Sequence, residues 1–498
     1  MEWTRAKRYQ AYSNWTAAEL LSLQQQVATS DYLPHYHVSP LSGLLNDPNG
    51  FSFFNNQWHL FYQAFPFGAV HGLKSWFHLV SDDLVHWKQQ GLALKPDTIY
   101  DSHGAYSGSA HVIKDKLFIM YTGNVRDKDW QRHPYQNGAW LDKNNRLTKL
   151  QRPLFDQPEH TTDHFRDPQL LYLNNTYYAL LGAQDKETLS GKIALFCSKN
   201  LHDWQDLGYL DFTNNDMGYM VECPNLVLVD NKPLLIFCPQ GLNKKIMNYD
   251  NIYPNVFIIG DTLNLAGASF TSRQAAPLNF DEGFDVYATQ AFNAPDGNAY
   301  AVSWVGLPDI SYPTDQENWA HCLSQVKELR IKDGCLYQRP VPAMAQLRTA
   351  GKHLTPGNNK ISEKNCLIDH PSQHFELKLT IPAGQAGTLH LAADKLLTHS
   401  LALEFSTSKK AFLSVDRQNA GAPFAKKYGT KRSVKLPADT SLVLDIFFDN
   451  SICEIFVNNG SHVLTLRLFP SKKQQKIILE SSQFIDYNGT WWNLKPIN

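Results

Sequence analysis

The sequence lacks the features that mark several common classes of protein. No stretch of its 498 residues approaches the roughly 20 consecutive apolar residues of a membrane-spanning helix. The N-terminal region has no apolar run of about 7–15 residues, such as a secretory signal requires. The formal net charge is −1, so there is no excess of positive charge to bind nucleic acid. We therefore expect a cytoplasmic protein with no membrane or nucleic-acid partner.

Cysteine is scarce and scattered. The seven cysteines form no Cys-x-x-Cys pair and accompany no cluster of histidines. An odd and widely spaced set argues against both a disulfide framework and a zinc site. We expect buried, reduced thiols.

What the sequence does contain is a repeated β-hairpin. Five segments share one layout: a polar loop, an apolar run, a tight polar turn and a second apolar run. With one loop residue of each segment as a marker, the steps along the chain are 60, 60, 55 and 59 residues. A repeat of this size built from hairpins is typical of β-propeller blades. The segments are 46–63, 106–123, 166–183, 222–239 and 286–306, and the markers are Asp47, Ser107, Asp167, Glu222 and Asp281.

A second repeated motif supports the propeller. The stretches SDDLVHW (81–87) and SKNLHDW (198–204) each follow a hairpin and precede another strand-like stretch. We therefore predict an all-β chain in which residues 35–348 form a five-bladed β-propeller. On periodicity alone, the generic hairpins of a β-sandwich are the alternative.

Three further regions complete the expected organisation. Residues 1–34 form an extension with a short helix at 16–28, where Thr16 begins the Thr-x-x-Glu spacing of a capping box. Residues 349–360 are rich in Gly, Pro and Asn and predict a linker. Residues 361–498 alternate between apolar and polar with period two, which predicts a C-terminal antiparallel β-sandwich.

Three carboxylates occupy the same loop position in three of the repeats. Asp47, Asp167 and Glu222 each lie beside a proline or one residue from it, which stiffens the loop that presents them. Such loops converge at the central channel of a propeller, so we expect the three acids to share one pocket. Glycoside hydrolysis uses paired carboxylates without a metal. A calcium site is the alternative, but it favours more oxygen ligands from one compact loop. We expect no metal and no cofactor.

Three motifs of the sequence resemble those of a known enzyme family. NDPNG (46–50), RDP (166–168) and EC (222–223), in that order, resemble the three hallmark motifs of glycoside hydrolase family 32, the invertase and fructanase family. Within the family, the chain is most similar to the bacterial sucrose-6-phosphate hydrolases. Further matches are HLFYQ (59–63), YSGSA (106–110), FDEGFDVYA (280–288) and EIFVNNG (454–460).

The resemblance implies a propeller followed by a sandwich, and hydrolysis of β-fructofuranosides with net retention of configuration. It assigns Asp47 as the nucleophile, Glu222 as the acid/base and Asp167 as a transition-state stabiliser. A retaining mechanism predicts that the carboxyls of Asp47 and Glu222 lie about 5–5.5 Å apart. Residues expected to bind the sugar substrate are Leu45, Asn46, Gln63, Trp76, Tyr106, Ser107, Arg166, Asp281 and Trp304.

The glucosyl side of the site departs from the family pattern. Many members carry a tryptophan shortly after the FYQ motif, where this chain has His71. His71 and Lys74 are therefore candidates for binding the phosphate of sucrose 6-phosphate. Other basic candidates for the rim of the pocket are Arg132, His133, Lys244 and Lys245.

Four functions stay open from the sequence. The first is hydrolysis of sucrose 6-phosphate, and the second is an invertase indifferent to phosphate. The third is a fructanase that acts on inulin or levan. The fourth is a non-catalytic sugar-binding propeller, although such a module has no need of a protonated acid. The oligomeric state is not predicted.

Overall fold

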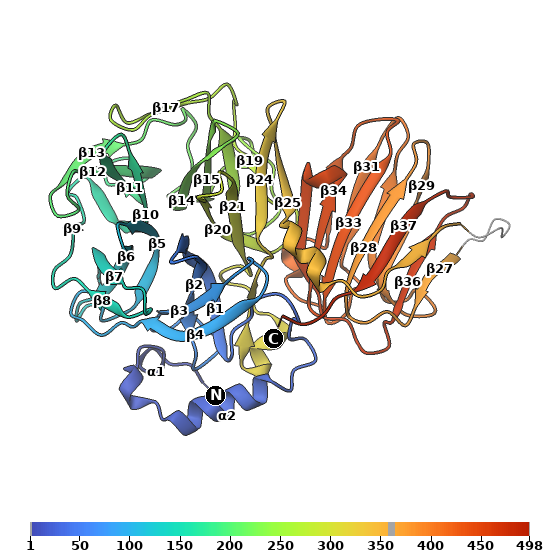
Figure 1. Ribbon diagram of the computed structural model, residues 1–498, viewed down its shortest axis with the longest axis horizontal. Coiled ribbons are helices and arrows are strands. Elements are labelled where there is room, and N and C mark those ends of the chain that lie inside the picture. The colour runs from blue at the N-terminus through green and yellow to red at the C-terminus, as the bar shows by residue number, and fades with distance from the viewer. Residues whose placement is uncertain (1, 357–363, 498) are drawn as a thin grey trace.

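The computed structural model describes residues 2–356 and 364–497, and strands dominate it (Figure 1). Two short helices, α1 (Arg5–Arg8) and α2 (Ala17–Val27), precede the strands and lie below the first blade in Figure 1. α2 begins as predicted, because the side chains and backbone of Thr16 and Glu19 form a reciprocal capping box. No helix in the described ranges is long and apolar enough to cross a membrane.

The first domain is the predicted five-bladed propeller, with one antiparallel sheet per blade. Its inner strands β1, β5, β10, β14 and β20 contact one another in a closed ring, because β20 lies against both β14 and β1. Blade 1 consists of β1 (Gly43–Phe54), β2 (Gln57–Phe65), β3 (Ser75–Ser81), β4 (Trp87–Leu94) and the added β22 (Trp319–Ala320). Blade 2 consists of β5 (Ala105–Ile113), β6 (Lys116–Arg126), β7 (Arg132–Leu141), β8 (Leu147–Lys149) and β9 (Phe155–Asp156). Blade 3 consists of β10 (Thr161–Leu173), β11 (Thr176–Asp185), β12 (Gly191–Ser198) and β13 (Trp204–Tyr209).

Blades 4 and 5 complete the ring. Blade 4 consists of β14 (Met220–Val229), β15 (Lys232–Gln240), β16 (Val256–Ile259) and β19 (Leu278–Asn279), with a side hairpin of β17 (Thr262–Asn264) and β18 (Ser269–Thr271). Blade 5 consists of β20 (Val286–Asn293), β21 (Ala299–Val305), β24 (Lys327–Lys332), β25 (Cys335–Pro340) and the short β23 (Cys322–Leu323).

The repeated SDDLVHW and SKNLHDW motifs form the same turn in two blades. Each connects the third strand to the fourth, between β3 and β4 and between β12 and β13. In both turns the serine hydroxyl accepts the N–H of a leucine three residues later, at 2.9 Å. Both leucines, Leu84 and Leu201, have positive φ (70° and 67°). The sequence echo is therefore a structural repeat.

Every inner strand carries a β-bulge at the equivalent point. The register with the second strand of the blade shifts there, and the strand bends at the end of the channel. Bulges are frequent beside active sites, because they redirect side chains without breaking the sheet. The bulged pairs are Asn46–Asp47, Tyr106–Ser107, Asp167–Pro168, Cys223–Pro224 and Ala288–Thr289.

Just beyond the bulges, a ring of five buried polar side chains joins the blades. Each accepts a hydrogen bond from a backbone N–H of the next blade, and the fifth closes the circle on blade 1. The bonds run from Gly108 to Asn49 (2.9 Å), from Leu170 to Ser109 (2.7 Å), from Leu226 to Gln169 (2.6 Å), from Ala291 to Asn225 (3.2 Å) and from Phe51 to Gln290 (2.7 Å). This ring fixes the relative heights of the inner strands, and hence of the bulges.

The second domain is a β-sandwich of two six-stranded sheets, which lies beside the propeller (Figure 1). A continuous apolar core of Leu, Ile, Val and Phe side chains fills the space between the sheets. One sheet contains β26 (Lys352–Leu354), β37 (Asn488–Asn493), β28 (His374–Ile381), β33 (Leu442–Asp449), β34 (Ile452–Val457) and β35 (His462–Arg467). The other contains β27 (Lys364–Asp369), β36 (Lys476–Glu480), β29 (Ala386–Ala393), β30 (Leu401–Ser406), β31 (Phe412–Asp416) and β32 (Lys431–Lys435).

The stretch expected to be a linker is partly built into the sandwich. Residues 352–354 form β26, which pairs with β37 at the edge of a sheet. Residues 357–360 of the expected linker lie outside the described residues.

Buried charges join the two domains. His37, at the start of the propeller, contacts Asp449 (2.9 Å) and Glu454 (3.5 Å) of the sandwich. Although burial opposes it, hydrogen bonds to these two carboxylates raise the pKa of His37 to about 9. Lys327 of blade 5 contacts Glu454 at 3.8 Å. All four side chains are fully buried, so these charges lie inside the interface between the two domains.

Candidate active site

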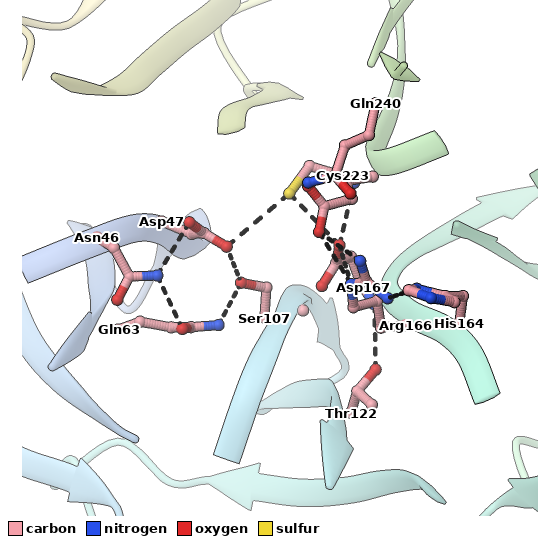
Figure 2. A network of polar contacts seen from close by, with 12 residues as sticks. Asn46, Asp47, Gln63, Ser107, Thr122, His164, Arg166, Asp167, Cys223 and Gln240 are labelled. Carbon is pink, nitrogen blue, oxygen red and sulfur yellow. Dashed lines mark hydrogen bonds and ion pairs between the residues drawn. The ribbon is translucent and has the colours of Figure 1, made fainter. Parts of the chain in front are cut away.

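Asp47 lies on the bulge of β1 and is held by two hydrogen-bond donors (Figure 2). Asn46 Nδ2 donates to one carboxylate oxygen at 3.0 Å, and the Ser107 hydroxyl donates to the other at 2.5 Å. Asn46 Nδ2 also donates to Gln63 Oε1 (2.8 Å), and Gln63 Nε2 donates to Ser107 Oγ (2.6 Å). Asn46, Gln63 and Ser107 therefore form a closed polar circuit around Asp47.

Lys74 sets the direction of this circuit. Its buried ammonium donates to Asn46 Oδ1. Because an ammonium can only donate, the amide oxygen of Asn46 must face Lys74 and its nitrogen must face Asp47. The Gln63 oxygen accepts from Asn46, so the Gln63 nitrogen must donate to the Ser107 oxygen. The hydroxyl proton of Ser107 then points at Asp47. Burial lowers the pKa of Lys74 to about 7, against the opposing charge of Asp47.

Burial raises the pKa of Asp47 above its ordinary value. The hydrogen bonds from Ser107 and Asn46 and the charge of Lys74 act in the opposite direction, while the charge of Glu222 adds to the rise. The circuit therefore favours the carboxylate form of Asp47 in a setting that would otherwise neutralise it.

Asp167 and Cys223 occupy the bulges of the next two acidic blades. Both residues have positive φ (65° and 48°), a conformation that costs energy for side chains other than glycine and clusters at functional sites. The N–H of Cys223 donates to Asp167 Oδ2 at 3.2 Å. The Cys223 sulfur lies 3.6 Å from Asp167 and 3.9 Å from Asp47, so it stands between the two carboxylates (Figure 2). Burial raises the pKa of this thiol well above its usual range, which keeps it a donor.

The surroundings of Asp167 favour its protonated form. Burial raises its pKa to about 7, Arg166 opposes the rise, and the charges of Glu222 and Asp47 add to it. Because the three acids interact, this proton belongs to the cluster of carboxylates as a whole.

Glu222 receives four hydrogen bonds from three side chains. Arg166 donates to Oε1 through Nε (3.0 Å) and Nη2 (2.6 Å). Gln240 and the Tyr287 hydroxyl donate to Oε2 at 2.6 and 2.5 Å. The side chain keeps 15 % of its surface exposed, so it remains within reach of a ligand. Glu222 is thus oriented from two sides and open on a third.

The site therefore brings together all three predicted acids. Asn46 and Ser107 are bonded to Asp47, Arg166 is bonded to Glu222, and Gln63 joins Asn46 to Ser107. Within the described ranges, no group of three or more His, Cys, Asp or Glu side chains is arranged to hold a metal ion.

Three expected sugar-binding side chains are used elsewhere. Trp76 is completely buried against Phe61 and cannot offer its face to a ligand. Leu45 is also completely buried, in the apolar core of the propeller. Asp281 accepts hydrogen bonds from the hydroxyl (2.6 Å) and N–H (2.9 Å) of Thr465, so its carboxylate joins the propeller to the sandwich.

The two phosphate candidates have different surroundings. The Lys74 ammonium is committed to Asn46 inside the protein, which corrects the expectation that it meets a phosphate at the rim. His71 is exposed and lies near Trp304, with ring centroids 6.2 Å apart. Trp304 is nearly fully buried, and Tyr106 is partly exposed beside the circuit.

Four residues contribute to the site without having been predicted from the sequence: Cys223, Tyr287, Gln240 and Thr122. Cys223 and Tyr287 lie inside motifs already noted, EC and FDEGFDVYA, but their contacts depend on bulges that no local pattern reveals. Gln240 ends β15 opposite the start of β14. Thr122 accepts the N–H of Asp167 at 3.1 Å from the neighbouring blade.

Comparisons with known proteins agree with this geometry. The model of the glycosyl hydrolases family 32 N-terminal domain matches residues 37–340, and that of the family 32 C-terminal domain matches residues 343–492. The chain is 50 % identical over 470 residues to a sucrose-6-phosphate hydrolase of Pediococcus pentosaceus, covering 94 % of this chain and 92 % of that protein.

Solved structures show the same fold. The structure of a sucrose-6-phosphate hydrolase from Lactobacillus gasseri has a TM-score of 0.97 and 53 % identity, with complete coverage of both chains. A β-fructofuranosidase mutant from Bombyx mori, solved in complex with sucrose, has a TM-score of 0.82 and 25 % identity over 97 % of this chain and 99 % of that one. The chain described here therefore belongs to glycosyl hydrolase family 32.

Proposed function

We propose that the protein is a retaining β-fructofuranosidase that hydrolyses sucrose 6-phosphate, sucrose or both, releasing fructose and glucose 6-phosphate or glucose. The observation that carries the proposal is the pairing of Asp47, held by two donors, with Glu222, oriented by Arg166 and Tyr287 but still partly exposed. Membership of family 32 and the names of the relatives support the choice of substrate.

In the first step, Asp47 attacks C2 of the fructosyl unit while Glu222 gives its proton to the bridging oxygen. The bond from C2 to that oxygen breaks, the glucosyl product leaves, and fructose stays esterified to Asp47. The donors of Asn46 and Ser107 keep the attacking carboxylate ionised and aligned.

Proton delivery needs a rearrangement within the cluster. In the structure Glu222 accepts hydrogen bonds from Arg166. Burial raises the pKa of the neighbouring Asp167 to about 7, which favours a proton on Asp167. We infer that substrate hydroxyls draw Arg166 away from Glu222 and that this proton then passes from Asp167 to Glu222. Asp167 is then a carboxylate that stabilises the positive charge on the sugar ring.

In the second step, Glu222 takes a proton from water as the water oxygen attacks C2. The ester to Asp47 breaks, fructose leaves and Glu222 is protonated again. Two inversions at C2 give net retention.

Steady-state rates with sucrose, sucrose 6-phosphate and inulin test the assignment. We expect cleavage of the two disaccharides and little of inulin, and Asp47→Ala should abolish turnover while binding persists. Efficient cleavage of inulin would favour a fructanase, and near-wild-type turnover by Asp47→Ala would refute the mechanism. Retained binding without any hydrolysis by the wild type would favour a sugar-binding module.

We also propose a cytoplasmic location. All seven cysteines are unpaired, and Cys335 and Cys366 are exposed. A reducing compartment maintains such thiols.

A further inference from the structure

Two arginines face each other at the end of the hairpin formed by β6 and β7. Arg126 and Arg132 are direct cross-strand partners, so their side chains leave the sheet on the same face. Like charges in this arrangement repel, and folding alone does not favour them.

Neither arginine is paired directly with an acid, although the charge of Asp163 acts on Arg132. Among the described residues, no carboxylate forms an ion pair with Arg126 or Arg132, and the buried Nε atom of each lacks a hydrogen-bond partner. Through its side chain, Arg126 donates to the carbonyl of Trp130 (3.0 Å). Burial together with the charges of Arg166 and Arg126 lowers the pKa of Arg132. Two adjacent, half-buried guanidinium groups with unpaired Nε–H donors have the chemistry to bind an anion.

The pair lies on the side of the active site where Arg166 holds Glu222. Thr122 and Arg126 share one face of β6, and Thr122 binds the backbone of Asp167. Arg126 lies four residues after Thr122 on β6, which places the two Cα atoms about 13 Å apart at the rise of an antiparallel strand. Arg132 is close enough to Arg166 to repel it, and Arg166 in turn holds Glu222, the group that protonates the departing sugar.

The N-terminal extension closes this region. Tyr9 packs edge-on against Trp130 of the hairpin, with ring centroids 5.0 Å apart. Burial and the neighbouring Tyr106 raise the pKa of the Tyr9 hydroxyl, whereas the charges of Arg126 and Arg132 lower it. Two phenol hydroxyls and two guanidinium groups therefore lie near one another beside this hairpin.

Building on the function proposed above, we propose that Arg126 and Arg132 bind the phosphate ester of the glucosyl unit of sucrose 6-phosphate. The planar guanidinium groups donate to phosphate oxygens, and Tyr9 and Tyr106 add neutral donors. The phosphate is thereby assigned not to Lys74, which is committed to Asn46, but to two arginines whose Nε atoms have no hydrogen-bond partner.

Substrate preference separates this role from a structural one. We expect Arg132→Gln and Arg126→Gln each to lower kcat/KM for sucrose 6-phosphate about 10- to 100-fold, and to change kcat/KM for sucrose less than about 3-fold. Arg132→Lys keeps the positive charge but loses the planar guanidinium group, so kcat/KM for sucrose 6-phosphate should fall less than in Arg132→Gln. Arg152→Gln, at an exposed arginine of the same blade, is the matched control and should change neither rate.

Inhibition distinguishes a sugar phosphate from the free ion. Glucose 6-phosphate should inhibit sucrose hydrolysis by the wild type, and its inhibition constant should rise about tenfold or more in Arg132→Gln. An equally low inhibition constant for inorganic phosphate would assign the arginines to the free ion and overturn the proposal. An unchanged ratio of the two kcat/KM values in both glutamine variants would also overturn it. Failure of the wild type to cleave either substrate would instead refute the proposed function.

Discussion

Replacing Lys74 by methionine tests how the nucleophile is kept ionised. Methionine retains the apolar length of the side chain but removes the ammonium that donates to Asn46. Two effects follow. The charge that lowers the pKa of Asp47 is lost, and the Asn46 amide is free to turn its oxygen toward Asp47. Both effects raise the pKa of Asp47.

The expected magnitude follows from the geometry. An opposite charge within about 4–6 Å shifts the pKa of an acid by about 1–3 units. Lys74 acts through Asn46 rather than by direct contact, so we expect a shift of about 1 unit, or about 1.4 kcal/mol. Lys74 has a pKa of about 7, so it is charged at the acidic pH where Asp47 titrates.

The pH dependence of kcat/KM measures this shift. The nucleophile must be ionised, so the acidic limb of the profile should move to higher pH, with about a tenfold loss of kcat/KM below both midpoints. Lys88→Met is the control, because Lys88 is exposed and pairs with Asp82 at the surface (2.9 Å). An acidic limb that stays in place, or moves to lower pH, in a folded Lys74→Met protein would refute the reasoning.

Three further predictions concern the acid, the propeller ring and the domain interface. Glu222→Gln keeps the shape of the side chain but has no acidic proton to deliver, so kcat should fall about 10²–10⁴-fold; a near-wild-type kcat would contradict the acid role. Gln169→Leu leaves the buried N–H and C=O of Leu226 unpaired, so the free energy of unfolding should fall by about 2–5 kcal/mol, measured by denaturant titration. A loss below about 0.5 kcal/mol would show that the ring does not stabilise the propeller. The raised pKa of His37, about 9, stabilises the folded state fully below about pH 6.5, and this contribution is lost as the pH rises through 9. The melting temperature of the wild type should therefore fall over that window, whereas that of His37→Asn should fall less; equal slopes would exclude His37 as the cause.

The strands of the propeller could be predicted because each hairpin is local. Alternating apolar residues, tight polar turns and the two Ser-x-x-Leu turns are all read within about 20 residues, and the structure places a blade at each of the five segments. Convergence of Asp47 and Asp167 also followed from their position in the repeat, because both lie on the bulge of an inner strand, whereas Glu222 lies one residue before the bulge of its strand.

The fifth marker shows where periodicity fails. Asp281 precedes β20, and the bulge of blade 5 lies at Ala288–Thr289, which carries no acid. FDEGFDVYA contains several acids, and spacing alone could not show that Asp281 binds Thr465 of the sandwich. Contacts of this kind join residues nearly 200 positions apart, and no local pattern encodes them. For the same reason, the burial of Trp76 and Lys74 became visible only in three dimensions.

The stereochemistry of fructosyl transfer tests the central claim most directly. With methanol present as a competing acceptor during sucrose cleavage, the first-formed methyl fructofuranoside can be assigned by NMR before it reacts further. Attack by Asp47 followed by attack of the acceptor inverts C2 twice, which predicts the β-anomer. Formation of the α-anomer would mean a single inversion and would contradict Asp47 as the nucleophile.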